Sequence, residues 1–102
     1  MPTMIVLVNL KENVAAEESE RWLRERYVPA IRDLPSVDEW RGHRVGGLAA
    51  SGGEPPHGYI VSVEVNDLGQ LGRDMESERV QALLGELDRY AEVTQLMTER
   101  FI

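Results

Sequence analysis

The sequence predicts an α+β domain in which two helices cover one face of a four-stranded antiparallel sheet. Three observations support this fold class: an apolar run rich in β-branched residues at 4–10, an alternating apolar and polar segment at 59–65, and helical periodicity at 14–34 and 77–90. A chain of 102 residues has the length of one domain with one hydrophobic core. We therefore expect a single domain over residues 1–102.

Residues 4–10 predict a strand that is buried on both faces, with Asn9 as its one polar member. Asn13 is a residue type that caps helices, so we expect it to begin a helix from Val14 to about Leu34. Apolar residues recur there at steps of three and four, which is the spacing of one helix face.

Pro29 interrupts this helical pattern. Proline lacks the N–H donor and its ring clashes with the preceding turn, so we expect a kink or loosening near Glu25 and Arg26. Pro35 should end the helix.

The middle of the chain predicts two neighbouring strands. Residues 37–48 are polar and contain three glycines, which favours a curved edge strand with a bulge near Gly46 and Gly47. Residues 51–58 predict a loop. In the strand at 59–65, Tyr59, Val61, Val63 and Val65 share one face, and Ile60, Ser62 and Glu64 share the other.

The last third supplies the remaining elements. Asp67 and Gln70 have capping-box spacing and predict a short helical turn, and Ser77 should cap a longer helix to about Tyr90. Residues 94–101 predict the last strand. The resulting βαββαβ order is ferredoxin-like.

One face of this sheet, which carries Ile5 and Leu7, has nothing in the predicted chain to cover it. A second copy related by a two-fold axis can cover it and protect the long edge strand. We therefore expect a homodimer formed through the open sheet face.

Composition excludes several classes of function. The chain has 11 basic and 18 acidic residues and a net charge of -7, so we expect no binding to nucleic acid or to an anionic membrane. The cluster of Arg21, Arg24 and Arg26 alternates with Glu20 and Glu25, which predicts a solvated helix face. The chain has no cysteine, and residues 4–10 are too short to span a bilayer. We expect a soluble, cytoplasmic protein.

Scattered positions along nearly the whole chain resemble the RedY/HapK-like proteins. The resemblance lies in residues 5–11, 27–37, 59–65, 67–68, 74–75 and 96–100. It implies membership of the dimeric α+β barrel superfamily, with a pocket between sheet and helices. It also implies a role in bacterial secondary metabolism, at the bipyrrole stage of prodigiosin-type pathways. Other superfamily members include cofactor-free monooxygenases, isomerases and cyclases. The resemblance therefore predicts the fold more specifically than it predicts the activity.

Two residues are candidates for catalysis. Histidine side chains titrate near neutrality, so His43 is a candidate acid or base; the alternative is a surface histidine on an edge strand. Glu64 interrupts an apolar strand, and on a dimerising face it would enter a partly dry cavity. Its alternative role is an ion pair with Arg41 or Arg44. Both pairs of interpretations stay open.

Five residues are candidates for substrate binding. Asn9 shares the Ile5 and Leu7 face and can bind a ligand carbonyl or satisfy a strand end. Tyr27 and Trp40 can form an aromatic wall or belong to the core. Arg44 shares strand parity with Trp40, whereas His43 points the opposite way unless a bulge intervenes. Ser62 lies on the Glu64 face. These candidates are Asn9, Tyr27, Trp40, Arg44 and Ser62.

We expect no cofactor. Two histidines without a suitably spaced carboxylate pair predict no metal site, and the chain lacks a Gly-rich phosphate loop. The leading hypothesis is cofactor-independent condensation, cyclisation or oxidation of a small aromatic or polyketide-like ligand. In it His43 or Glu64 moves a proton, and Asn9 and Arg44 stabilise negative charge on oxygen. The alternative is a non-catalytic module that sequesters an unstable intermediate.

Overall fold

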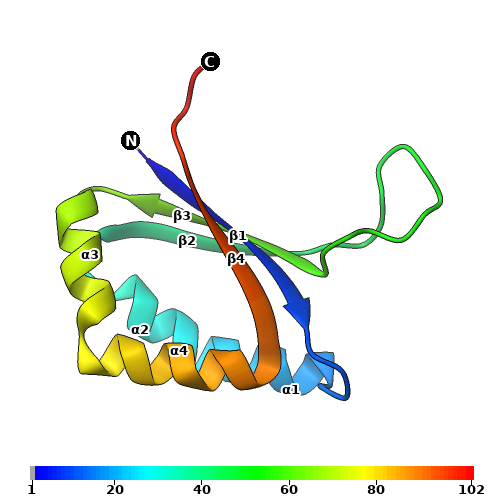
Figure 1. Ribbon diagram of the computed structural model, residues 1–102, viewed down its shortest axis with the longest axis horizontal. Coiled ribbons are helices and arrows are strands. Elements are labelled where there is room, and N and C mark those ends of the chain that lie inside the picture. Colours follow the sequence, from blue (N-terminus) through cyan, green and yellow to red (C-terminus); the bar gives the residue numbers. More distant parts are fainter. Residues whose placement is uncertain (1) are drawn as a thin grey trace.

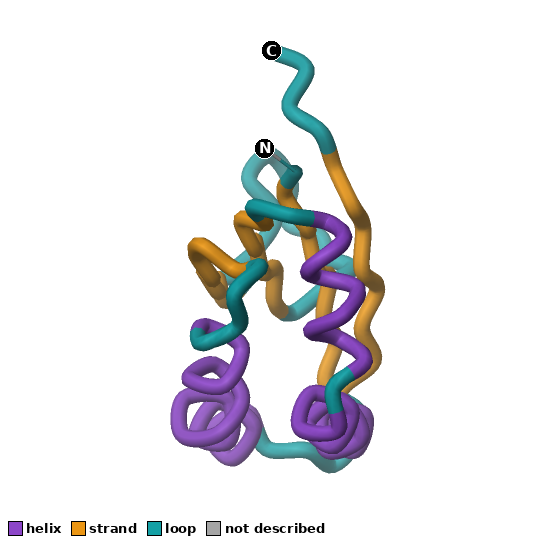
Figure 2. Tube along the Cα trace, turned by 90° about the vertical axis from the view of Figure 1, so that its left-hand side faces the viewer, coloured by secondary structure: helices purple, strands orange, loops and turns teal. Residues whose placement is uncertain are grey.

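A computed structural model describes residues 2–102 and confirms the predicted fold class. The elements are β1 (Thr3–Leu10), α1 (Ala16–Trp22), η1 (Leu23–Tyr27), α2 (Val28–Arg32), β2 (Val37–Arg44), β3 (Tyr59–Val65), α3 (Leu68–Glu76), α4 (Glu78–Tyr90) and β4 (Ala91–Thr98). The antiparallel sheet has the order β2-β3-β1-β4. The elements α1, η1 and α2 follow one another directly and together form the first helical segment. This segment and α4 lie on the same side of the sheet, and α3 closes one end of it (Figures 1 and 2).

The first helical segment loosens at the place that Pro29 predicted. Leu23 to Tyr27 form a π-helical turn, η1, in which the Val28 N–H donates to the Leu23 carbonyl, five residues back. Pro29 has no N–H to give to the carbonyl of Glu25, so a wider turn is a favourable way to continue the helix. The segment ends at Arg32, before Pro35.

The predicted cap at Asn13 is wrong. Asn13 has φ 65, a left-handed conformation that asparagine tolerates, and it lies in the turn between β1 and α1. The helix begins at Ala16 after an Ala15 cap that makes no side-chain hydrogen bond. The other two caps are confirmed: Asp67 accepts from the Gln70 N–H at 3.0 Å, and Ser77 accepts from the Val80 N–H at 3.3 Å.

Two strands differ in their bounds from the prediction. β2 is an edge strand as predicted, but it ends at Arg44 rather than near Leu48. Its irregularity lies between Val37 and Glu39, and Gly46 and Gly47 belong to the following loop. β4 covers Ala91–Thr98 rather than residues 94–101. It starts directly after α4 with Ala91, which is buried and pairs with Leu10.

The core lies between the sheet and the helices. It contains the predicted face of β3, Val61, Val63 and Val65, together with Val6 of β1 and side chains of the helices. The opposite side of the sheet, the open face, carries the other parity of each strand. Its centre is apolar, and register places four side chains next to one another there: Ile5, Leu7, Ile60 and Leu96.

Candidate functional site

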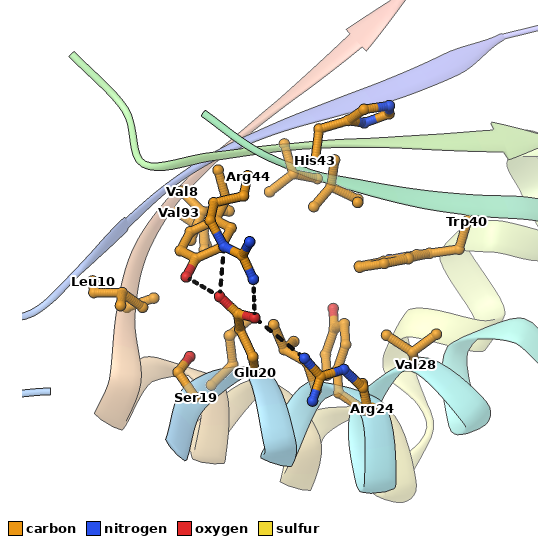
Figure 3. Close-up of a pocket in the computed structure, with 18 residues that line it drawn as sticks. Val8, Leu10, Ser19, Glu20, Arg24, Val28, Trp40, His43, Arg44 and Val93 are labelled. Carbon is orange, nitrogen blue, oxygen red and sulfur yellow. Dashed lines mark hydrogen bonds and ion pairs between the residues drawn. The ribbon is translucent and has the colours of Figure 1, made fainter. Parts of the chain in front are cut away.

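A cavity of about 250 Å³ lies between the helix-facing side of the sheet and the first helical segment (Figure 3). Apolar residues form most of its wall, and they come from every strand and from the helices. Examples are Val6, Val8, Leu23, Val28, Val61 and Val93. A cavity of roughly 150 Å³ accommodates benzene, so this one has room for a ligand of about two rings.

Four polar side chains meet at one end of this cavity, and we call them the Glu20 cluster: Glu20, Arg24, Arg44 and Tyr59. Arg44 on β2 donates to Glu20 on α1 through Nε at 3.0 Å and also through Nη2. The Tyr59 hydroxyl donates to Glu20 Oε2 at 2.7 Å, and Arg24 Nη2 lies 3.3 Å from Oε1. Figure 3 shows the two guanidinium groups converging on the carboxylate.

These contacts fix the protonation states of the cluster. The hydrogen bonds from Arg44 and then from Tyr59 lower the pKa of Glu20 from 4.5 to about 2. Burial and the neighbouring Glu20 raise the pKa of Tyr59, and burial raises the pKa of Tyr27. Glu20 therefore stays ionised and both tyrosines stay protonated across the neutral range.

The ionised Glu20 predicts a specific acid sensitivity. A carboxylate with a lowered pKa stabilises the fold above its unfolded pKa of 4.5, and this contribution is lost as the pH falls toward about 2. The pKa change corresponds to at most ~3 kcal/mol. Screening around Arg44, whose side chain is 67% exposed, reduces this to about 1–2 kcal/mol. We expect Glu20→Gln to unfold in urea with a flatter pH dependence between pH 4.5 and 2.

Glu17→Gln is the matched control, because Glu17 is an exposed carboxylate in the first turn of the same helix. Its pH dependence should follow that of the wild type. Equal slopes for Glu20→Gln and the wild type would show that the cluster does not stabilise the fold.

Three of the predicted site residues line the cavity together. Tyr27, Trp40 and Arg44 all border it, and the Trp40 ring extends into it from β2 (Figure 3). Trp40 lies across Gly42: a Cβ at residue 42 would be only 2.9 Å from indole atoms Cη2 and Cζ3. A glycine at this position is therefore what allows the indole to lie against the strand.

The other four predicted site residues lie on the open face. His43 borders the cavity, but its ring points to the other side of the sheet, as its strand parity predicted (Figure 3). Ser62 and Glu64 follow the open-face parity of β3. Glu64 accepts from the Thr3 hydroxyl at 3.0 and 3.1 Å and sits opposite Glu39, while Arg41 pairs with Glu39 at 2.7 Å.

Asn9 holds the loop that follows β2. Its side chain donates to the Pro56 carbonyl at 2.9 Å, lies 3.2 Å from His57 Nδ1, and accepts from the Gly58 N–H at 3.0 Å. These contacts match the strand-end interpretation of Asn9. They leave its ligand-binding role a prediction.

Sequence reasoning missed Glu20, Arg24 and Tyr59. The alternating charges of residues 20–26 predicted a solvated helix face, yet the Glu20 side chain is only 14% exposed. The available signal was the spacing of Glu20 and Arg24, four residues apart, together with the parity that puts Tyr59 on the core face of β3. Neither signal identifies Arg44 as the partner.

Two further kinds of site to consider among the described residues are a metal site and a membrane-spanning helix. Among residues 2–102, no three histidine, aspartate or glutamate side chains gather in a way that can hold a metal ion. Within the same range, no helix is long and apolar enough to cross a membrane.

Solved structures with the same fold place the chain among known proteins. HapK from Hahella chejuensis shares 27% sequence identity at a TM-score of 0.81, covering 99% of this chain and 93% of that chain. A dimeric ferredoxin-like protein from Thermobifida fusca shares 12% identity at a TM-score of 0.74, covering 97% and 90%. SnoaB, a cofactor-independent oxygenase from Streptomyces nogalater, shares 11% identity at a TM-score of 0.77, covering 99% and 93%.

The last two similarities show the fold alone. No curated protein matches this sequence. The family model described as REDY-like protein HapK matches residues 2–101, almost the full length of the chain. The resemblance seen in the sequence is thereby confirmed, and this chain belongs to the REDY-like HapK family.

Proposed function

We propose that this protein binds a small, flat, two-ring intermediate of bacterial secondary metabolism in the cavity between its sheet and first helical segment. The observation that carries this proposal is the cavity itself: about 250 Å³, mostly apolar walls, an indole projecting into it and one polar cluster at its end. Small-molecule sites combine apolar walls with a few convergent polar groups in this way. A bipyrrole of the prodigiosin-type pathways has the required size and shape.

The ionisation of the cavity favours binding and charge stabilisation over proton transfer by the cavity residues. A general acid or base works best when its pKa is near the operating pH, whereas the pKa values of Glu20, Tyr27 and Tyr59 are all shifted away from neutrality. We therefore expect ligand affinity to be nearly constant between about pH 6 and 8, the range in which a histidine titrates. Cofactor-independent catalysis in this cavity would proceed through its fixed charges.

Acid–base catalysis by His43 or Glu64 is the second candidate function, and it would take place on the open face. The observation in its favour is the half-buried Glu64 carboxylate, held by Thr3 opposite a second carboxylate, Glu39. If Glu64 moves the proton, Glu64→Gln should reduce turnover at least about a hundredfold. Full activity in that variant would remove Glu64 from the mechanism.

The test of the proposed function uses 2,2′-bipyrrole-5-carbaldehyde and its precursors as probes. Tryptophan fluorescence reports binding, and mass spectrometry of the same mixture reports turnover. A fluorescence change with a new mass supports an enzyme, and a change without a new mass supports the sequestering module. No response in either measurement would contradict the proposed ligand class.

We further propose that the protein is a homodimer whose copies meet through the open face. The apolar centre of that face includes Ile60 and Leu96, which are 39% and 45% exposed in the single chain. An exposed apolar sheet surface of this kind is typical of an interface, and a two-fold axis pairs it with itself. A protein from Thermobifida fusca with the same fold is described as dimeric, which supports a dimer of this chain.

Ile60→Lys should weaken dimerisation at least about tenfold, because each dimer would then bury two unpaired charges. Sedimentation velocity over a range of protein concentrations measures this effect. Leu68→Lys is the matched control: Leu68 is 53% exposed but lies on α3, the helix that closes one end of the sheet (Figure 1), and not on a strand of the open face. A monomeric wild type, or equal effects of the two variants, would refute the proposed interface.

A further inference from the structure

The Glu20 cluster carries more positive than negative charge. Two guanidinium groups face one carboxylate, and the Tyr59 hydroxyl adds a neutral donor. Glu20 is fully engaged, since each of its oxygens receives two of the contacts. In a chain of net charge -7, this end of the cavity is therefore a local site of positive potential.

The two arginines keep donors available for a ligand. A guanidinium has five N–H donors, and to the residues described here Arg44 gives only Nε and Nη2 and Arg24 only Nη2. Their side chains are 67% and 70% exposed while they also line the cavity. Glu20 aligns both groups, so the ordering of two long side chains is already achieved before a ligand arrives.

The Trp40 indole and the Arg44 guanidinium are close enough for one small molecule to contact both. The Trp40 indole lies over Gly42, and Arg44 follows on the same strand face. Two residues along a strand span about 7 Å. A molecule of about two fused or linked rings can therefore stack on the indole and still place a terminal group against Arg44.

Resting on the proposed binding function, we propose that the cavity selects a planar two-ring ligand that carries an anionic oxygen, such as a carboxylate or an enolate. The rings stack against Trp40, and the anionic oxygen accepts hydrogen bonds from the unused N–H groups of Arg44 and Arg24. Charge-assisted hydrogen bonds of this kind are about twice as strong as neutral ones.

The test compares naphthalene-2-carboxylate with its neutral isostere naphthalene-2-carboxamide by isothermal titration calorimetry at pH 7. The wild type should bind the carboxylate about tenfold more tightly. Arg44→Gln should bring the two affinities within about threefold, because the carboxylate loses a charge-assisted hydrogen bond and the carboxamide only a weaker one, and Arg24→Gln should reduce the preference in part. The preference should also shrink as the salt concentration rises.

Arg41→Gln is the matched control, because Arg41 lies on the same strand, on the opposite face, and pairs with Glu39. It should keep the wild-type preference. Equal affinities of the wild type for the two probes would overturn the charge selection and leave the binding function intact. Failure of both probes to bind would overturn the charge selection, and the binding function would be overturned with it if 2,2′-bipyrrole-5-carbaldehyde also failed to bind.

Discussion

Asp74→Ala is expected to lower the free energy of unfolding by about 3 kcal/mol. Asp74 is 8% exposed, and its Oδ2 accepts from the Ser36 hydroxyl at 2.6 Å and from the Ser36 N–H at 3.1 Å. Gln70 donates to its other oxygen at 2.7 Å. Ser36 is fully buried, so the alanine variant leaves two donors without a partner away from water. Hydrogen bonds to a charged group contribute about 1.5–3 kcal/mol each and are not additive.

Urea unfolding at pH 7 measures this effect. Asp88→Ala is the matched control, since Asp88 is 83% exposed and reaches Lys11 only at 3.8 Å; it should change stability by less than about 0.5 kcal/mol. The hydrogen bonds from Ser36 lower the pKa of Asp74, so its stabilisation is present above the usual pKa of 3.8 and is lost as the pH falls below it. A loss below 1 kcal/mol for Asp74→Ala would show that Ser36 finds other partners.

Trp40→Ala is expected to weaken binding of 2,2′-bipyrrole-5-carbaldehyde about 100-fold, or ~2.7 kcal/mol. The variant removes the ring that extends into the cavity (Figure 3), and stacking of a planar ring on an aromatic side chain contributes about 1–3 kcal/mol. Isothermal titration calorimetry measures the affinity in the absence of the indole signal.

Trp40→Phe is the conservative variant and should lose less than about tenfold, because it keeps a flat ring. Urea unfolding of both variants separates a lost stacking surface from a damaged fold. His43 borders the cavity on the same strand, but its ring points to the other side of the sheet, so His43→Ala should bind like the wild type. Unchanged binding by Trp40→Ala would place the ligand elsewhere.

Local sequence patterns predicted most of the fold. The period of two at residues 59–65 assigned the core face of β3, and Asp67 and Ser77 marked the starts of α3 and α4. Pro29 indicated where the first helical segment changes its turn. Asn13 shows the limit of such patterns: the same side chain suits a helix cap and a left-handed turn, and only the path from β1 to α1 selects the turn.

The candidate site depended on tertiary structure to a greater degree. Strand parity alone separates Trp40 and Arg44 from His43, because alternation is a local property of the backbone. The pairing of Arg44 with Glu20 joins residues 24 positions apart, and that of Tyr59 with Glu20 joins residues 39 positions apart. Glu20 looks like part of a solvated helix face until the sheet is packed over α1. The sequence by itself determined the helices and strands, their order and the face on which each strand residue lies. Tertiary packing decided which polar side chains share one cavity. Hydrogen bonds between residues far apart in the sequence depend on how the sheet and the helices pack together, and local spacing does not determine that.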